Sequence, residues 1–185
     1  MEFTKLHDQI WLVKQFMDEK DLTVLIQELD NLDESIWYGD QVSPDSYWYG
    51  RNMFYGDLSE AGQLIVKDAE RRMVECFGNY ERIHEIQSPL RSLNDGQSLG
   101  THKDNSAPDD HNNMYGVVIY LNDSYEGGEI HYPELEYEYK PSAGDMVVHY
   151  AGLLHGAKPA TGSTRYILTS FVKGDMSTTF LGDTL

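Results

Sequence analysis

Hydrophobic residues recur at helical spacing in two stretches of the first half of the chain. The first follows Asp18, a residue type that caps helices, and its apolar face carries Leu22, Leu25, Ile26, Leu29 and Leu32. The second begins after Ser59 and ends at Gly78, and its apolar face carries Ile65, Ala69, Met73, Cys76 and Phe77. A short apolar run at 9–13 predicts a strand in front of both helices.

Between the two helical stretches, residues 37–57 follow neither a helical nor a strand period. The segment is rich in aromatic residues interrupted by turn formers: Trp37, Tyr38, Gly39, Pro44, Tyr47, Trp48, Tyr49, Gly50, Phe54, Tyr55 and Gly56. We interpret it as a long loop with room for one short hairpin. Long loops in compact domains are often lids or binding loops, and packing of the rings over one end of the core is the alternative.

Beyond Gly78 the pattern changes to the alternation that is typical of strands. From Tyr80 towards Leu93 it predicts one long strand, with Pro89 at a bulge or an edge. Short strands then follow, and they are separated by turn signals at 94–96, 105–113, 122–128, 140–144 and Gly152. The predicted fold class is therefore mainly β with flanking helices (α+β): a double-stranded β-helix, or jelly roll, with N-terminal supporting helices.

The 185 residues fit a single domain, since the chain contains no internal repeat, low-complexity tract or linker. We expect an N-terminal strand and helix support over 1–80 and a jelly-roll core over 81–175. Hydrophobic residues make up 40% and aromatic residues 12%, which indicates a folded globule rather than disorder.

The formal net charge of -17, from 31 acidic and 14 basic residues, narrows the choice of partners. Such a surface repels phosphate backbones and anionic lipid headgroups, so nucleic acid and membranes are disfavoured. Cys76 is the only cysteine, which excludes an intrachain disulfide and fits a reducing compartment. Because no signal-like or membrane-spanning apolar run is visible, we expect a soluble, cytoplasmic protein.

Three residues in the second half of the chain form a candidate metal site. His102 and Asp104 are two residues apart, so their side chains point to one face of an extended backbone. A second histidine, His155, follows later, and ten residues after it Arg165 opens a β-branched run. Two imidazoles and one carboxylate make the facial triad that holds Fe(II) and leaves three positions open. The absence of thiolate ligands disfavours a closed structural zinc site.

The triad is part of an ordered set of motifs: His102-x-Asp104, Tyr120-Leu-Asn122, Gly127-Gly-Glu129, Gly144-Asp145, His155 with Pro159, and Arg165-Tyr166. This set, spread over about 90–172, resembles the prolyl 4-hydroxylase group of 2-oxoglutarate- and iron-dependent oxygenases. So compact a version resembles the small members found in bacteria and their phages, which would place it in the host cytoplasm if it is phage-encoded. The resemblance implies that His102, Asp104 and His155 are the catalytic metal ligands, with Fe(II), 2-oxoglutarate and O2 as reactants. It also allows ascorbate as a reductant.

The resemblance assigns three further residues to the cosubstrate. The planar guanidinium of Arg165 would bind the far carboxylate of 2-oxoglutarate, and Thr169 on the same strand face would add a hydroxyl. Tyr120 stands where relatives carry a tyrosine that reaches the cosubstrate; a core tyrosine is the alternative. One departure matters: relatives commonly place another tyrosine nine or ten residues before the first metal histidine, where this chain has Leu93 and Ser92.

Three histidines near the motifs have no assigned role: His111, His131 and His149. Each is expected to be satisfied by a neighbour or to face solvent, and His149, on the strand that leads to His155, could line the pocket.

These features predict hydroxylation of a substrate C–H bond, with release of succinate and CO2. We expect a prolyl residue in a peptide or protein as the substrate, gripped by Trp48 and Tyr49, because aromatic grooves bind polyproline II segments. The acidic surface favours a peptide with basic residues near its prolines. Two alternatives stay open: a hydroxylase of a free amino acid or other small molecule, and a non-enzymatic jelly-roll binding or structural protein. A nucleic-acid demethylase is disfavoured by the charge and by Phe171, where that class usually has a second arginine.

Overall fold

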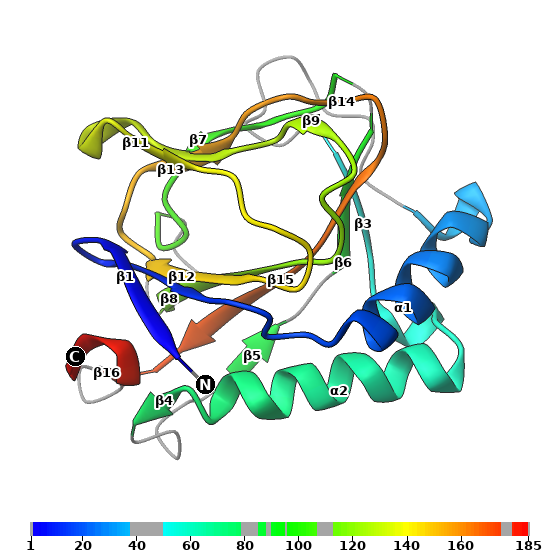
Figure 1. The fold of residues 1–185 in the computed structure, drawn as a ribbon, viewed down its shortest axis with the longest axis horizontal. Helices are drawn as coiled ribbons and strands as arrows, with labels where there is room; N and C mark the ends of the chain where they lie inside the picture. Colours follow the sequence, from blue (N-terminus) through cyan, green and yellow to red (C-terminus); the bar gives the residue numbers. More distant parts are fainter. Residues whose placement is uncertain are drawn as a thin grey trace.

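The computed structural model describes residues 2–37, 50–78, 85–87, 90–94, 96–106, 113–174 and 179–184. Two helices, α1 (Glu19–Asn31) and α2 (Glu60–Val74), lie together along one side of a β structure (Figure 1). All strand pairings are antiparallel within the described residues. This is the mainly β fold with supporting helices that the patterning predicts.

The large sheet has the strand order β1-β2-β12-β8-β15-β6-β3, and β5 also pairs with β15. Its strands are β1 (Phe3–His7), β2 (Ile10–Val13), β12 (Met146–Tyr150), β8 (Asn113–Tyr120), β15 (Arg165–Lys173), β6 (Leu90–Leu93), β3 (Arg51–Met53) and β5 (Glu85–Gln87). The second sheet has the order β11-β10-β13-β7, from β11 (Tyr137–Tyr139), β10 (Ile130–Tyr132), β13 (His155–Ala157) and β7 (Leu99–His102). The large sheet thus places residues from both halves of the sequence next to one another, whereas the strands of the second sheet all come from the second half.

Short elements complete the described chain. Two small pairs join β9 (Glu126–Gly127) to β14 (Ala160–Thr161), and β4 (Phe77–Gly78) to β16 (Thr179–Phe180). The 3-10 helices are η1 (Glu34–Ile36), η2 (Tyr55–Asp57), η4 (Pro133–Leu135) and η5 (Leu181–Thr184). No helix in these described ranges is long and apolar enough to cross a membrane.

Strand β15 separates two hydrophobic clusters because its side chains alternate between the faces of the large sheet. Tyr166, Leu168 and Val172 belong to the cluster that packs the sheet against the helices. Ile167 belongs to the cluster between the two sheets, and Arg165 lines the cavity there. The alternation predicted for this strand therefore holds, and it turns a charged side chain into the interior.

The predicted helix starts are correct and one predicted end is wrong. Ser59 caps α2, and its Oγ accepts a hydrogen bond from the Gly62 N–H at 3.2 Å. Helix α2 ends at Val74 rather than at Gly78, because Phe77 and Gly78 leave the helical path to pair with β16. The centres of the Phe77 and Phe180 rings lie 5.4 Å apart. This contact joins segments that are distant in sequence, so the local spacing of residues does not predict it.

The long strand predicted from Tyr80 is two separate strands within the described residues. Strand β5 pairs with the Phe171–Lys173 end of β15, whereas β6 pairs with its Arg165–Leu168 end. The expected loop at 37–57 is partly strand, since β3 forms an edge of the large sheet beside β6. Residues 38–49, with Trp48 and Tyr49, lie outside the described residues.

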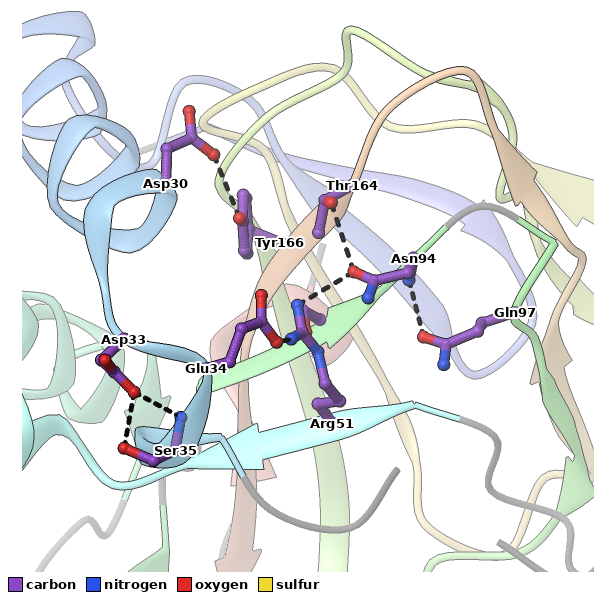
Figure 2. A network of polar contacts seen from close by, with 10 residues as sticks. Asp30, Asp33, Glu34, Ser35, Arg51, Asn94, Gln97, Thr164 and Tyr166 are labelled. Carbon is purple, nitrogen blue, oxygen red and sulfur yellow. Dashed lines mark hydrogen bonds and ion pairs between the residues drawn. The ribbon is translucent and has the colours of Figure 1, made fainter. Parts of the chain in front are cut away.

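A polar network joins η1 and β3 to the residue that precedes β15 (Figure 2). Its centre is Arg51, whose guanidinium forms an ion pair with Glu34 and donates a hydrogen bond to Asn94 Oδ1 at 3.0 Å. The same Asn94 oxygen accepts a hydrogen bond from Thr164 Oγ at 3.2 Å. Because Thr164 directly precedes Arg165, the network fixes the strand end on which this arginine lies.

Candidate active site

Two neighbouring strands of the second sheet bring His102, Asp104 and His155 together. His102 ends β7, His155 begins β13, and the two residues are direct partners in the antiparallel register. Asp104 follows in a turn held by its backbone N–H, which donates to the Ala151 carbonyl at 2.9 Å. The ligand atoms of the three side chains all lie within 4.8 Å of one another.

The hydrogen bonds of the two histidines point their metal-binding nitrogens at Asp104. Nδ1 of His102 lies 3.0 Å from the Gly100 carbonyl, and Nδ1 of His155 lies 2.9 Å from the Leu153 carbonyl. Because a carbonyl oxygen only accepts, each Nδ1 carries the proton and each Nε2 presents a lone pair. These Nε2 atoms lie 3.3 Å and 3.6 Å from Asp104 Oδ1. Three electron-pair donors converging in this way fit a bound cation.

Burial and the neighbouring imidazoles together set the charges that a metal site needs. Burial lowers the pKa of His155 to about 3, and the neighbouring His149 adds to this effect, so the imidazole is neutral at physiological pH. For Asp104 burial alone would raise the pKa, but contacts with the imidazoles of His102 and His149 outweigh it and hold the pKa well below the usual range. A neutral imidazole beside an ionised carboxylate is the state in which both bind metal without releasing a proton.

Arg165 lies in the same cavity as the triad. It is 2% exposed, and its guanidinium lies 5.1 Å from the centre of the Tyr120 ring. Within the described part of the chain, Arg165 Nε, Tyr120 Oη and Thr169 Oγ have no hydrogen-bond partner. Buried polar atoms are rarely left unpaired, so this group fits an anionic ligand such as the second carboxylate of 2-oxoglutarate.

The two positions at which relatives commonly carry a tyrosine, Leu93 and Ser92, have other roles in this structure. Leu93 is the direct neighbour of Arg165 in the sheet, and Ser92 instead accepts a hydrogen bond from Arg51 Nε at 3.3 Å. A different tyrosine, Tyr125 from the segment after β8, is 3% exposed and has an unpaired hydroxyl among the described residues. Burial raises the pKa of Tyr125, and the charge of Arg165 opposes that shift.

The remaining histidines separate into different environments. His149 lines the cavity and hydrogen-bonds Asp104. His131 lies on β10 between Ile130 and Tyr132, whose side chains point into the core, so alternation turns His131 away from the triad. His111 lies outside the described residues, as do Trp48 and Tyr49.

Arg91 is a cavity residue that the sequence reasoning missed. It lies on β6 opposite Ile167 and leans over the Phe171 ring, with 5.6 Å between guanidinium and ring centre. Arg91 and Leu93 are two residues apart, which predicts that their side chains point to the same face of the strand. Only the pairing of β6 with β15 shows that this face lines the cavity.

Comparisons with known proteins agree with this geometry. Residues 88–173 match the family model of the 2OG-Fe(II) oxygenase superfamily. A PKHD-type hydroxylase of Synechococcus sp. (strain JA-2-3B'a(2-13)) is 31% identical over 134 residues, which cover 66% of this chain and 59% of that protein. The match thus spans less than two thirds of this relative's length.

Solved structures show the same fold. A Pseudomonas putida prolyl-4-hydroxylase superposes with a TM-score of 0.69 at 18% identity, over 90% of this chain and 93% of that chain. A Trichoplax adhaerens prolyl hydroxylase, solved in complex with a hypoxia inducible factor oxygen degradation domain peptide fragment, superposes with a TM-score of 0.71 at 16% identity, over 90% and 84%.

The triad thus lies inside the region, residues 88–173, that matches the 2OG-Fe(II) oxygenase superfamily, and the double-stranded β-helix has the fold of the solved prolyl 4-hydroxylases. The family and the His-Asp-His set together imply Fe(II) and 2-oxoglutarate as the groups that this cavity binds.

Proposed function

We propose that this protein is a 2-oxoglutarate- and Fe(II)-dependent dioxygenase that hydroxylates a substrate C–H bond and releases succinate and CO2. One observation carries the proposal: three converging metal-ligand atoms share a cavity with a buried arginine and unpaired hydroxyls. We also propose that residues 1–185 act as one domain, since α1, α2 and the large sheet share one hydrophobic cluster.

Each residue of the site has a defined task. His102, Asp104 and His155 hold the iron, and His155 can do so as a neutral imidazole because burial keeps it deprotonated. Arg165 pairs with the far carboxylate of 2-oxoglutarate, and Tyr120 and Thr169 donate hydrogen bonds to it. Burial raises the pKa of Tyr120 to about 12 although the charge of Arg165 opposes it, so the phenol keeps its proton. Bound iron, 2-oxoglutarate and O2 supply the oxidising chemistry.

A prolyl residue in a peptide or protein is the proposed substrate. The prolyl hydroxylase-like fold supports this choice, and the net charge of -17 favours a peptide with basic residues near its prolines. Trp48 and Tyr49 are proposed to grip the peptide.

The test is aerobic turnover of 2-oxoglutarate to succinate against a panel of proline-containing peptides. Each peptide is paired with a control in which alanine replaces proline, and mass spectrometry detects the gain of one oxygen atom. Proline-dependent succinate that disappears in Asp104→Ala supports the proposal. Succinate that forms equally with both members of every pair argues against a prolyl target and leaves the oxygenase.

Arg91 favours one alternative, the hydroxylation of a free amino acid or another small carboxylate. Its guanidinium lines the cavity beside Phe171, and a carboxylate is the ligand group that a guanidinium binds through paired hydrogen bonds. Comparing the kcat/KM of free proline with that of the best peptide decides between the two substrates, and the alternative requires that Arg91→Ala raise the KM of free proline.

A further inference from the structure

A third histidine is built into the core of the site. His149 lies on β12 next to its last residue, is 0% exposed, and its ring centre is 4.2 Å from that of His155. Its Nε2 lies 3.2 Å from Asp104 Oδ2, the carboxylate oxygen that does not face the two metal-binding nitrogens. On its other side, Nδ1 lies 3.2 Å from the Tyr132 hydroxyl.

The partners of His149 determine which nitrogen carries its proton. An ionised carboxylate only accepts, so Nε2–H donates to Asp104 and Nδ1 is the acceptor of the Tyr132 hydroxyl. Burial raises the pKa of Tyr132 well above its usual value, which keeps that phenol protonated as a donor. This tautomer is opposite to that of His102 and His155, whose protons lie on Nδ1. His149 is therefore a hydrogen-bond donor to the site and not a fourth metal ligand through Nε2.

Gly116 makes this contact possible. It is the sheet partner of His149 on β8, and a Cβ at this position would lie 2.2 Å from Asp104 Oδ2 and 2.5 Å from His149 Nε2. Such distances are far below van der Waals contact, so a side chain here would separate the two groups. The strand thus leaves just the space that the imidazole and the carboxylate occupy.

We propose that His149, held in its tautomer by Tyr132, is a positioning residue that restrains Asp104 to bind the metal through one oxygen. The proposal rests on the iron-dependent function proposed above. With Oδ2 engaged by His149, only Oδ1 faces His102 and His155. A carboxylate that bound the metal through both oxygens would take up a position that 2-oxoglutarate needs. Outer hydrogen bonds of this kind typically change metal affinity by about 10–100-fold when removed.

The test measures Co(II) affinity, and then 2-oxoglutarate affinity on the Co(II)-saturated protein, with no turnover involved. We expect His149→Phe to weaken Co(II) binding roughly 10–100-fold and to weaken 2-oxoglutarate binding as well. His149→Gln, whose amide can donate to Asp104, should recover part of the loss. Tyr132→Phe, which removes one hydroxyl, should weaken Co(II) in the same direction by less than about tenfold.

The matched control is His131→Phe, a histidine on β10 that faces away from the cavity, with unchanged Co(II) affinity expected. Wild-type affinity in both His149→Phe and Tyr132→Phe would overturn the positioning role. So would a fall in Tm with unchanged affinities, because that outcome is loss of packing alone. A wild-type protein that fails to bind Co(II) at all refutes the metal site, and with it the proposed function.

Discussion

Replacing Arg165 by alanine tests how the cavity recognises its cosubstrate. Arg165 is 2% exposed, and no acidic side chain among the described residues lies within ion-pair distance of its guanidinium. A ligand carboxylate would therefore be its counter-charge. Removing one partner of a buried ion pair typically costs ~3–5 kcal/mol. At 1.4 kcal/mol per tenfold change, Arg165→Ala should weaken 2-oxoglutarate binding by roughly two to three powers of ten.

The assay is calorimetric titration of 2-oxoglutarate into the Co(II)-loaded protein. Co(II) binding itself should be unchanged, because Arg165 is not a metal ligand. Arg165→Lys should recover only part of the affinity, since a lysine keeps the charge but loses the planar pair of donors. Arg91→Ala is the matched control: it removes the second cavity arginine from the neighbouring strand, and we expect 2-oxoglutarate affinity to stay within about threefold, or less than 1 kcal/mol.

Two results would refute this reasoning. Unchanged affinity in Arg165→Ala would show that the arginine does not bind the cosubstrate. Equal losses of 2-oxoglutarate affinity in the Arg165 and Arg91 variants would show that the cavity attracts the dianion by its overall charge. The paired donors of the Arg165 guanidinium would then have no specific role.

Three further variants or treatments have expected outcomes. Asp104→Ala should abolish coupled turnover, measured as succinate formed per hydroxylated product, whereas a halogenase-like site would survive the change. The Trp48→Ala/Tyr49→Ala double variant should raise the KM for peptide and leave peptide-independent decay of 2-oxoglutarate nearly intact; a joint loss of Tm and of both activities would instead assign these rings to packing. Burial raises the pKa of Cys76 to about 12, so iodoacetamide at pH 8 should label this thiol only after unfolding, and rapid labelling of the native protein would contradict the buried position.

Local patterns predicted those parts of the molecule that local forces decide. The cap at Ser59 and the alternation that turns Arg165 and Thr169 inward depend on neighbours in sequence, and both agree with the structure. The early end of α2 depends on pairing between β4 and β16, which lie about a hundred residues apart. Spacing within the helix contains no information about that contact.

The metal triad was predictable because His102-x-Asp104 and His155 lie within an ordered set of motifs, but its surroundings were not. Pairing of β12 with β8 places His149 beside Gly116 and Asp104, and Tyr132 comes from the opposite sheet. The network therefore forms only when three segments of the chain have come together in the folded protein. Arg91 was missed for the same reason, since its position depends on β6 lying next to β15.

The most direct measurement is an anaerobic crystal structure with Fe(II) and 2-oxoglutarate, with the metal located by anomalous scattering at the iron edge. We predict one iron site bound by Nε2 of His102, Nε2 of His155 and one oxygen of Asp104, with the far carboxylate of 2-oxoglutarate on Arg165. Iron bound elsewhere, for example by His131, or 2-oxoglutarate placed away from Arg165, would contradict the proposed active site.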